Sequence, residues 1–275
     1  MSRVIAIANQ KGGVGKTTTA INLGAGLAVA EQRTLIVDMD PQGNATSGLG
    51  FDTNTITSSV YDVLVDGTAL QDSILARVHF PFLDLLPSSQ DLVGAEVELV
   101  DRPHRELGLR HALASVREQY RYVLVDCPPS LGLLTLNTLA AADTVLIPIQ
   151  CEFYALEGLS QLLNTIRLVQ QNLNPALQVE GVLLTMFDSR LNLSRQVAEE
   201  AKEYFGSRVF RSVIPRNVRL AEAPSFGKPI VLYDILSSGA QSYLALAKEV
   251  LAREAEAGAG RSQLPASESA GRAGR

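Results

Sequence analysis

The residues best suited to bind a phosphate group lie in one short stretch, residues 10–18, with the sequence QKGGVGKTT. Its glycines allow the backbone to curl so that successive N–H groups point at an anion. The ammonium of Lys16 would reach the outer phosphates of a nucleotide, and the hydroxyl of Thr17 would contact Mg²⁺. The predicted nucleotide-binding residues are Lys11, Gly12, Gly13, Val14, Gly15, Lys16, Thr17 and Thr18.

This stretch departs from the general phosphate-loop pattern G-x-x-x-x-G-K-[ST] at its first position, where Gln10 replaces glycine. A second lysine, Lys11, follows it inside the loop. Two like charges around one nucleotide repel each other, so Lys11 is useful only if it reaches a different nucleotide.

Three aspartates follow apolar runs and are the candidate metal and water-positioning groups. Asp38 and Asp40 are two residues apart, so on an extended chain their carboxylates point the same way. Pro41 disfavours helix at Asp40 and keeps this turn extended. Asp126 ends the apolar run at residues 122–126, a pattern that places a carboxylate to hold Mg²⁺ through a water. The predicted metal-site residues are Thr17, Asp38 and Asp126.

Strand-like apolar runs alternate with helical patterns and would position these residues. Strands are expected at residues 4–8, 34–38, 83–86, 122–126, 144–149, 179–186 and 209–214, and helices at 17–30, 57–65, 156–172, 193–205 and 240–255. Continuous Val, Ile and Leu runs are typical of strands covered on both faces. The pattern predicts an α/β fold, a doubly wound and mostly parallel sheet, with one domain at residues 1–254 and a disordered tail at 255–275. Ligands of such sheets bind at the carboxyl ends of the strands.

Composition limits the class of protein. A net charge of -5 does not indicate a general nucleic-acid binder, so any such site must be local. Two cysteines, Cys127 and Cys151, form no disulfide framework or zinc spacing and indicate reduced thiols in the cytoplasm. No uninterrupted apolar run has the length of a membrane span.

The phosphate-loop variant resembles the deviant Walker A motif of the ParA/MinD family of ATPases, which implies ATP and Mg²⁺ as ligands. In that family the extra lysine, here Lys11, crosses a dimer interface to the partner's phosphates. The family's D-x-D-P motif implies that Asp40 positions the attacking water and that Asp38 lies near the metal shell. The resemblance thus makes Lys11, Lys16 and Asp40 the predicted catalytic residues. The segment after Asp126 resembles the family's switch II.

A late segment, residues 213–230, closely resembles a block found in chromosomal ParA (Soj) proteins. The resemblance implies that Pro215, Arg216 and Asn217 lie against adenine. Between residues 208 and 228 there are five basic residues and one acid, a local strip suited to DNA phosphates. By resemblance Arg190 and Arg219 touch DNA, and Arg211 and Lys228 of the same strip are further candidates. The family usually has a basic residue where this chain has Leu236, so one DNA contact is missing.

The base and the partners follow from the same comparison. Related GTPases carry [NT]-K-x-D at a position where this chain has Met186 in place of the lysine, which favours ATP over GTP. The resemblance predicts a DNA-partitioning ATPase that forms a homodimer with ATP, binds non-specific double-stranded DNA and releases it after hydrolysis. A ParB-type centromere-binding protein would stimulate hydrolysis, and the protein would be cytoplasmic and nucleoid-associated.

Three alternatives remain open. A MinD-like membrane regulator needs an amphipathic terminal helix, yet Leu264 is the only large aliphatic residue beyond Leu251. An iron protein of the nitrogenase type bridges its dimer with cysteines, and Cys127 is a candidate for one of them. This alternative leaves the late segment unexplained. A nucleotide-dependent scaffold without DNA would keep ATP hydrolysis and lack the DNA contacts.

Overall fold

The computed structural model describes residues 2–152 and 159–262, and its strands form one parallel sheet in the order β3-β2-β4-β1-β5-β6. The α/β class and the doubly wound parallel sheet predicted from the sequence are confirmed. The strand bounds are β1 Arg3–Ile7, β2 Thr34–Asp38, β3 Leu83–Leu86, β4 Tyr122–Asp126, β5 Thr144–Gln150 and β6 Gln178–Thr185.

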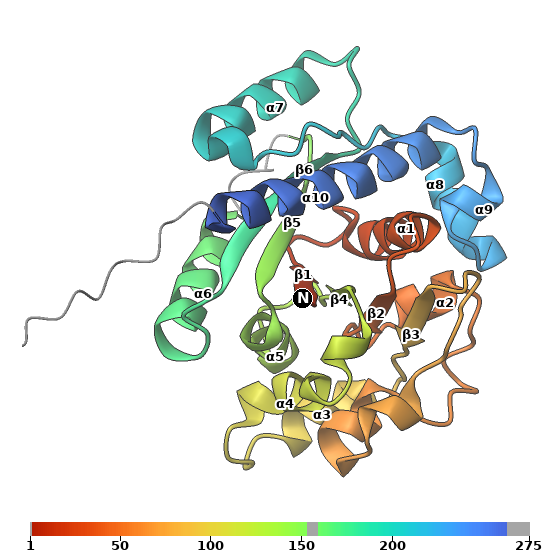
Figure 1. Ribbon diagram of the computed structural model, residues 1–275, viewed down its shortest axis with the longest axis vertical. Helices are drawn as coiled ribbons and strands as arrows, with labels where there is room; N and C mark the ends of the chain where they lie inside the picture. Colours follow the sequence, from red (N-terminus) through yellow and green to blue (C-terminus); the bar gives the residue numbers. More distant parts are fainter. Residues whose placement is uncertain (1, 153–158, 263–275) are drawn as a thin grey trace, which may run out of the picture.

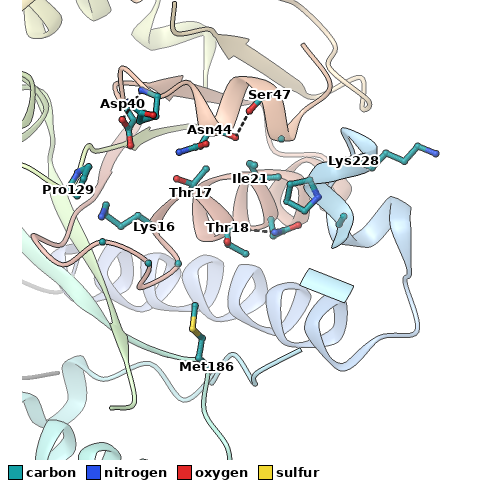
Figure 2. Close-up of a pocket in the computed structure, with 18 residues that line it drawn as sticks. Lys16, Thr17, Thr18, Ile21, Asp40, Asn44, Ser47, Pro129, Met186 and Lys228 are labelled. Atoms are coloured by element: carbon teal, nitrogen blue, oxygen red, sulfur yellow. Dashed lines mark hydrogen bonds between the residues drawn. The ribbon is translucent and has the colours of Figure 1, made fainter. Parts of the chain in front are cut away.

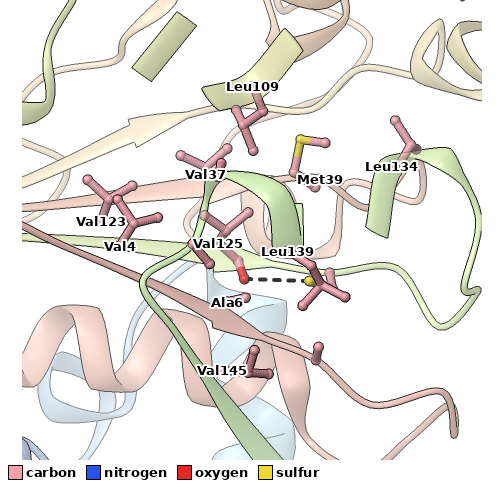
Figure 3. Packing of buried hydrophobic residues seen from close by; sticks show 14 of the residues in the cluster. Val4, Ala6, Val37, Met39, Leu109, Val123, Val125, Leu134, Leu139 and Val145 are labelled. Carbon is pink, nitrogen blue, oxygen red and sulfur yellow. Dashed lines mark hydrogen bonds between the residues drawn. The ribbon is translucent and has the colours of Figure 1, made fainter. Parts of the chain in front are cut away.

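Successive residues of the strands enter two different cores. In β1, Val4 and Ala6 belong to the cluster on one face of the sheet, whereas Ile5 and Ile7 belong to the cluster on the other. Figure 3 shows the first of these clusters, in which side chains of the strands meet those of α4 and α5. Burial on both faces explains why the strands are continuous apolar runs without polar alternation.

The helices cover both faces of the sheet (Figure 1). Helices α1 and α10 pack on one face, and α4, α5 and α6 contribute to the core on the opposite face. The α-helices are α1 Lys16–Val29, α2 Asn44–Gly48, α3 Leu92–Glu98, α4 Gly108–Ala114, α5 Leu133–Ala141, α6 Leu159–Asn172, α7 Asn192–Phe205, α8 Val218–Glu222, α9 Ile230–Tyr233 and α10 Ser238–Ser262. Shorter helical turns are η1 Asp62–Asp66, η2 Leu70–Ser73, η3 Arg105–Leu107, η4 Arg117–Gln119, η5 Gly206–Arg208 and η6 Ala223–Phe226.

The seventh predicted strand, residues 209–214, is wrong. The segment runs beside β6, and the amides of Phe210 and Ile214 donate to carbonyls of that strand. Between them, however, the carboxylate of Glu249 on α10 accepts the amides of Arg211 and Ser212, both at 2.8 Å. Because this side chain takes the backbone donors, the ladder is interrupted and only isolated bridges remain.

Two other predicted elements differ in detail. Where a helix was expected at residues 57–65, the structure has the π-helical turn η1, Asp62–Asp66. Helix α10 continues to Ser262, past the predicted boundary at 254, since the alanine- and glutamate-rich sequence after Leu251 favours helix.

The boundary of the folded domain stays a prediction, and residues 156–158 and 263–275 of the predicted elements lie outside the described residues. In the described part of the chain, no helix is both long and apolar enough to span a bilayer.

Candidate functional site: a phosphate loop facing three aspartates

The predicted phosphate loop connects β1 to α1 at the carboxyl edge of the sheet. Gly13 and Gly15 have φ angles of 74° and 89°, which side-chain-bearing residues rarely adopt. Val14 between them is buried, and its carbonyl accepts a 2.8 Å hydrogen bond from the hydroxyl of Thr185 at the end of β6. The loop is therefore fixed to the sheet at its centre. Its amides, together with those at the N-terminus of α1, are available to an anion.

The two lysines of the loop have different environments. Lys16 is only 6% exposed, and its Nζ donates to the carbonyl oxygen of Lys11 at 3.2 Å. Burial lowers the pKa of Lys16, while the negative charges of Asp126 and Asp40 act against that shift. Lys11 itself does not line the cavity in front of the loop. This placement agrees with a role for Lys11 outside its own nucleotide site.

Asp38 anchors the segment that follows β2, residues 38–50, called here the switch segment. Its carboxylate accepts hydrogen bonds from the amide and hydroxyl of Thr46, at 2.8 and 2.7 Å, and from the amide of Asp40 at 3.2 Å. Despite these bonds, complete burial raises the pKa of Asp38 to about 6. The Asp38 carboxylate thus already accepts three hydrogen bonds. It would act on a metal ion through the groups that surround the ion and would not be a direct ligand.

Asp126 is the carboxylate with unmet bonding capacity. It lies in register with Asp38 on the neighbouring strand and is completely buried. Among the residues that the structure describes, neither of its side-chain oxygens has a hydrogen-bond partner. Burial and then the charge of Asp38 raise its pKa well above the ordinary value, and the nearby Thr17 hydroxyl opposes this shift. A buried carboxylate without a hydrogen-bond partner would be stabilised by a bound cation.

The residues present fit Mg²⁺ with a nucleotide. In the described part of the chain no three His, Cys, Asp or Glu side chains form a metal-binding group. Mg²⁺ commonly uses one or two carboxylates and substrate phosphates, with water filling the rest of its shell. Thr17 and Asp126 would hold it and Asp38 would lie behind them.

Asp40 faces the loop across a cavity of about 560 Å³. Its carboxylate accepts from the amide of Gln42 at 3.0 Å, and its carbonyl accepts from the hydroxyl of Ser88 at 2.8 Å. Figure 2 shows Asp40, Lys16, Thr17 and Pro129 at one end of the cavity and Lys228 at the other. The lining comprises Gly12, Gly13, Gly15, Lys16, Thr17, Thr18, Ile21, Asn22, Asp40, Gln42, Asn44, Ser47, Gly48, Pro129, Met186, Ala223, Pro224 and Lys228.

The predicted adenine-side residues lie next to the cavity but do not line it. The backbone of Phe187 pairs with Ile214 and Arg216, which holds residues 215–217 beside Met186, a cavity residue. Asn217 caps α8 by accepting from the amide of Leu220 at 3.3 Å. The sequence reasoning missed Asn22, Ala223 and Pro224 as lining residues, because only the packing of α1, α2 and η6 brings them together.

The four predicted DNA-contact residues are exposed on the surface and differ in their partners. Arg190 forms an ion pair with Asp188 at 2.7 Å, and its side chain is 86% exposed. Arg219 is 54% exposed and pairs with Glu222 at 2.8 Å and Asp234 at 3.6 Å. The structure places Arg211 apart from these, beside Glu249 of α10, and Lys228 at the rim of the cavity with its ammonium directed outward (Figure 2).

The two cysteines do not support the iron-protein alternative. Cys127 and Cys151 are both buried, and burial raises the pKa of each thiol to about 12. Cysteines hold an iron–sulfur cluster as thiolates, and in the iron-protein alternative they must also be reachable from a second subunit. Neither side chain is in that situation.

A parallel sheet with a phosphate loop after its first strand and facing strand-end aspartates defines a P-loop nucleotide hydrolase. A family described as an AAA domain matches residues 2–179. The chain is 60% identical over 254 residues to the chromosome partitioning protein ParA of Myxococcus xanthus, covering 92% of this chain and 89% of that one. It is also 60% identical over 252 residues to the sporulation initiation inhibitor protein Soj of Bacillus subtilis, covering 92% and 99%. The chain belongs to the ParA/Soj family of chromosome partitioning ATPases.

A solved structure supports the fold and the nucleotide site. It is described as cobyrinic acid a,c-diamide synthase from Mycobacterium smegmatis with bound ADP and magnesium. It is 40% identical, with a TM-score of 0.81, and the match covers 94% of this chain and 97% of that one. The partition relatives are more similar in sequence than this protein is.

Proposed function

We propose that this chain is an ATP-driven DNA-partitioning switch that binds Mg·ATP in the cavity between the phosphate loop and the switch segment. The loop amides and Lys16 hold the phosphates, and Thr17 and Asp126 hold the metal, which neutralises phosphate charge. Asp40, across the cavity from the loop, orients the water that attacks the terminal phosphate. The neighbour solved with ADP and magnesium supports this ligand pair.

Two copies are proposed to pair face to face when ATP is bound. The placement of Lys11 outside its own cavity supports this step, since its charge is then available to the other copy's phosphates. There it would act as an arginine finger does in trans, neutralising charge in the transition state. Replacing Lys11 by alanine is expected to abolish dimer formation and hydrolysis while nucleotide binding to the single chain is retained.

The observation that carries the DNA arm is the exposure of Arg190 and Arg219 on a protein whose net charge is -5. Exposed guanidinium groups bind phosphates without reading the sequence, and such binding weakens steeply with salt. Pairing doubles the number of contacts, so retention on DNA should require ATP. Hydrolysis would then separate the copies and release the DNA, stimulated by a ParB-type partner.

The test is retention on non-specific duplex DNA at low salt, with ATP compared against ADP. We expect retention only with ATP and its loss as salt rises. Arg219→Glu and Arg190→Glu should each reduce retention while hydrolysis persists. Arg110→Glu is the matched control, because Arg110 is an exposed arginine on α4, which packs on the face of the sheet opposite α1 and α10. Equal retention with both nucleotides, or equal effects of all three changes, would contradict the DNA arm and leave a scaffold role.

A further inference from the structure

The switch segment touches the late segment through two glycine residues. A Cβ atom added at Gly227 would lie 2.5 Å from the Cα atom of Gly50, and one added at Gly50 would lie 3.1 Å from the Gly227 carbonyl oxygen. Gly50 and Gly227 have φ angles of +91° and +61°. The two backbones are therefore in direct contact, with no side chain between them to take up a displacement.

Neighbouring residues extend this contact. The same end of α2 approaches η6, where a Cβ at Gly48 would lie 3.6 Å from the Cβ of Pro224. The carbonyl of Leu49 is paired with the ring nitrogen Nε2 of His79 at 2.9 Å. The end of the switch segment is thus held between the loop before β3 and the late segment, so it cannot move without displacing one of them.

A second attachment joins the late segment to the phosphate-loop helix. Asn22 on α1 is 4% exposed, and its Oδ1 accepts from the amide of Ile230 at 2.7 Å. Its Nδ2 donates to the carbonyl of Thr18 at 2.8 Å. Residues 227 and 230 are therefore held by two different parts of the nucleotide site, one by the switch segment and one by the helix that follows the phosphate loop.

Along the chain, the stretch between these attachments lies between the two carboxylates that pair with Arg219. Glu222 precedes η6 and Asp234 follows α9, and both contact the guanidinium. If the switch segment moves relative to α1, residues 223–230 turn about the Asn22 attachment. Because Glu222 shares α8 with Arg219 whereas Asp234 lies beyond the moving stretch, that rotation changes the distance from Asp234 to Arg219 and hence the availability of the Arg219 charge.

We propose that the Gly50–Gly227 contact, with Asn22 as the opposite attachment, is the positioning contact through which the bound nucleotide sets the geometry of the DNA-binding surface. This inference rests on the proposed function, since it specifies how ATP binding reaches Arg219. It requires that the switch segment differ between the ATP and ADP states. Residues 223–230 then follow the switch segment because the backbones touch.

The direct test is Gly227→Ala, whose Cβ would force the two backbones apart. The matched control is Gly67→Ala, because Gly67 also has a positive φ, +74°, but a Cβ there meets nothing within 4 Å. Both variants carry the same kind of backbone strain, and only the first breaks the contact. We expect Gly227→Ala to lower ATP-dependent retention on DNA about tenfold, within the usual range of coupling between sites. Gly67→Ala should match wild type in retention on DNA.

A second measurement does not depend on DNA binding. Amide hydrogen exchange of residues 223–236 should differ between ATP and ADP in the wild type and in Gly67→Ala, and the difference should vanish in Gly227→Ala. The same nucleotide-dependent difference in Gly227→Ala overturns the proposal, as does the absence of any difference in the wild type. If Gly227→Ala does not fold, Gly50→Ala takes its place in the same comparison, because its Cβ would lie 3.1 Å from the carbonyl oxygen of Gly227 and so crowds the same contact less severely. If the wild type is not retained on DNA with either nucleotide, the DNA arm fails and the exchange data still decide the coupling.

Discussion

The pair of buried aspartates at the ends of β2 and β4 predicts an unusual dependence of stability on pH in the nucleotide-free protein. The folded pKa of Asp38 is about 6, above its ordinary value of 3.8. A carboxyl group whose pKa is raised by folding stabilises the fold when protonated. This contribution is complete below about pH 4 and is lost as the pH rises through about 6. The free energy of unfolding should therefore be larger at pH 5 than at neutral pH.

The size of the effect follows from the two pKa values of Asp38. The difference between about 6 and 3.8 corresponds to on the order of 3 kcal/mol in total. About 1.4 kcal/mol of this falls between about pH 5 and about pH 7.5, obtained by titrating the folded and unfolded carboxyl groups separately. In a protein of this size that corresponds to a shift of about 2–3 °C in the midpoint of thermal unfolding. Asp126, whose pKa is also raised, adds to the effect with the same sign.

The assay is urea unfolding at several pH values and constant ionic strength, with nucleotide and divalent cations removed. Asp126→Asn should stabilise the protein at neutral pH and flatten the dependence, because it removes a buried charge that has no hydrogen-bond partner among the described residues. Asp72→Asn, at an exposed position, controls for the loss of one surface charge. Adding Mg·ATP should also flatten the dependence, since a cation favours the ionised carboxylates. A protein that is less stable at pH 5 than at pH 7.5, or an unchanged slope in Asp126→Asn, would refute the reasoning.

Two further predictions concern single hydrogen bonds. Thr46→Val removes a buried hydroxyl that donates to Asp38 and accepts from a buried backbone amide, so unfolding free energy should fall by about 2–4 kcal/mol. Denaturant unfolding measures this, with Thr165→Val as the control because the Thr165 hydroxyl donates to a carbonyl of its own helix; equal effects would contradict the estimate. Glu222→Gln removes the charge paired with Arg219, and retention on DNA with ATP should rise about twofold to fivefold, as expected for an exposed ion pair. Unchanged or weaker retention, measured over a salt series, would show that this ion pair does not limit DNA binding.

The phosphate loop and the six strands were predictable from the sequence because their signals are local. A strand buried on both faces is a continuous apolar run wherever it lies in the sheet, and the loop is defined by adjacent glycines and lysines. The pairing of Asp38 with Asp126 was not readable in the same way. Each aspartate visibly ends a strand, but only the strand order places β2 beside β4 and brings the two carboxylates into register.

The failures of prediction have a common physical origin in contacts between distant residues. Residues 209–214 have the composition of a strand, yet Glu249 from a later helix accepts the amides that a ladder would use. Likewise Asn22 and Pro224 line the cavity because α1 and η6 both pack against α2, and nothing in either local sequence indicates a ligand. Side chains that satisfy the backbone of a remote segment leave no periodic signal in the sequence.

A surface that responds to a nucleotide needs an element that both the nucleotide site and the surface contact. In many proteins such an element is long, but here the cavity wall already includes both Thr18, beside the phosphate loop, and Lys228, in the late segment. Asn22 forms hydrogen bonds with the backbone of both regions, and the Gly50–Gly227 contact joins the late segment to the switch segment. Because the late segment forms part of the cavity, no long path is required. A rearrangement of the switch segment is transmitted through a single backbone contact to the segment that contains Arg219.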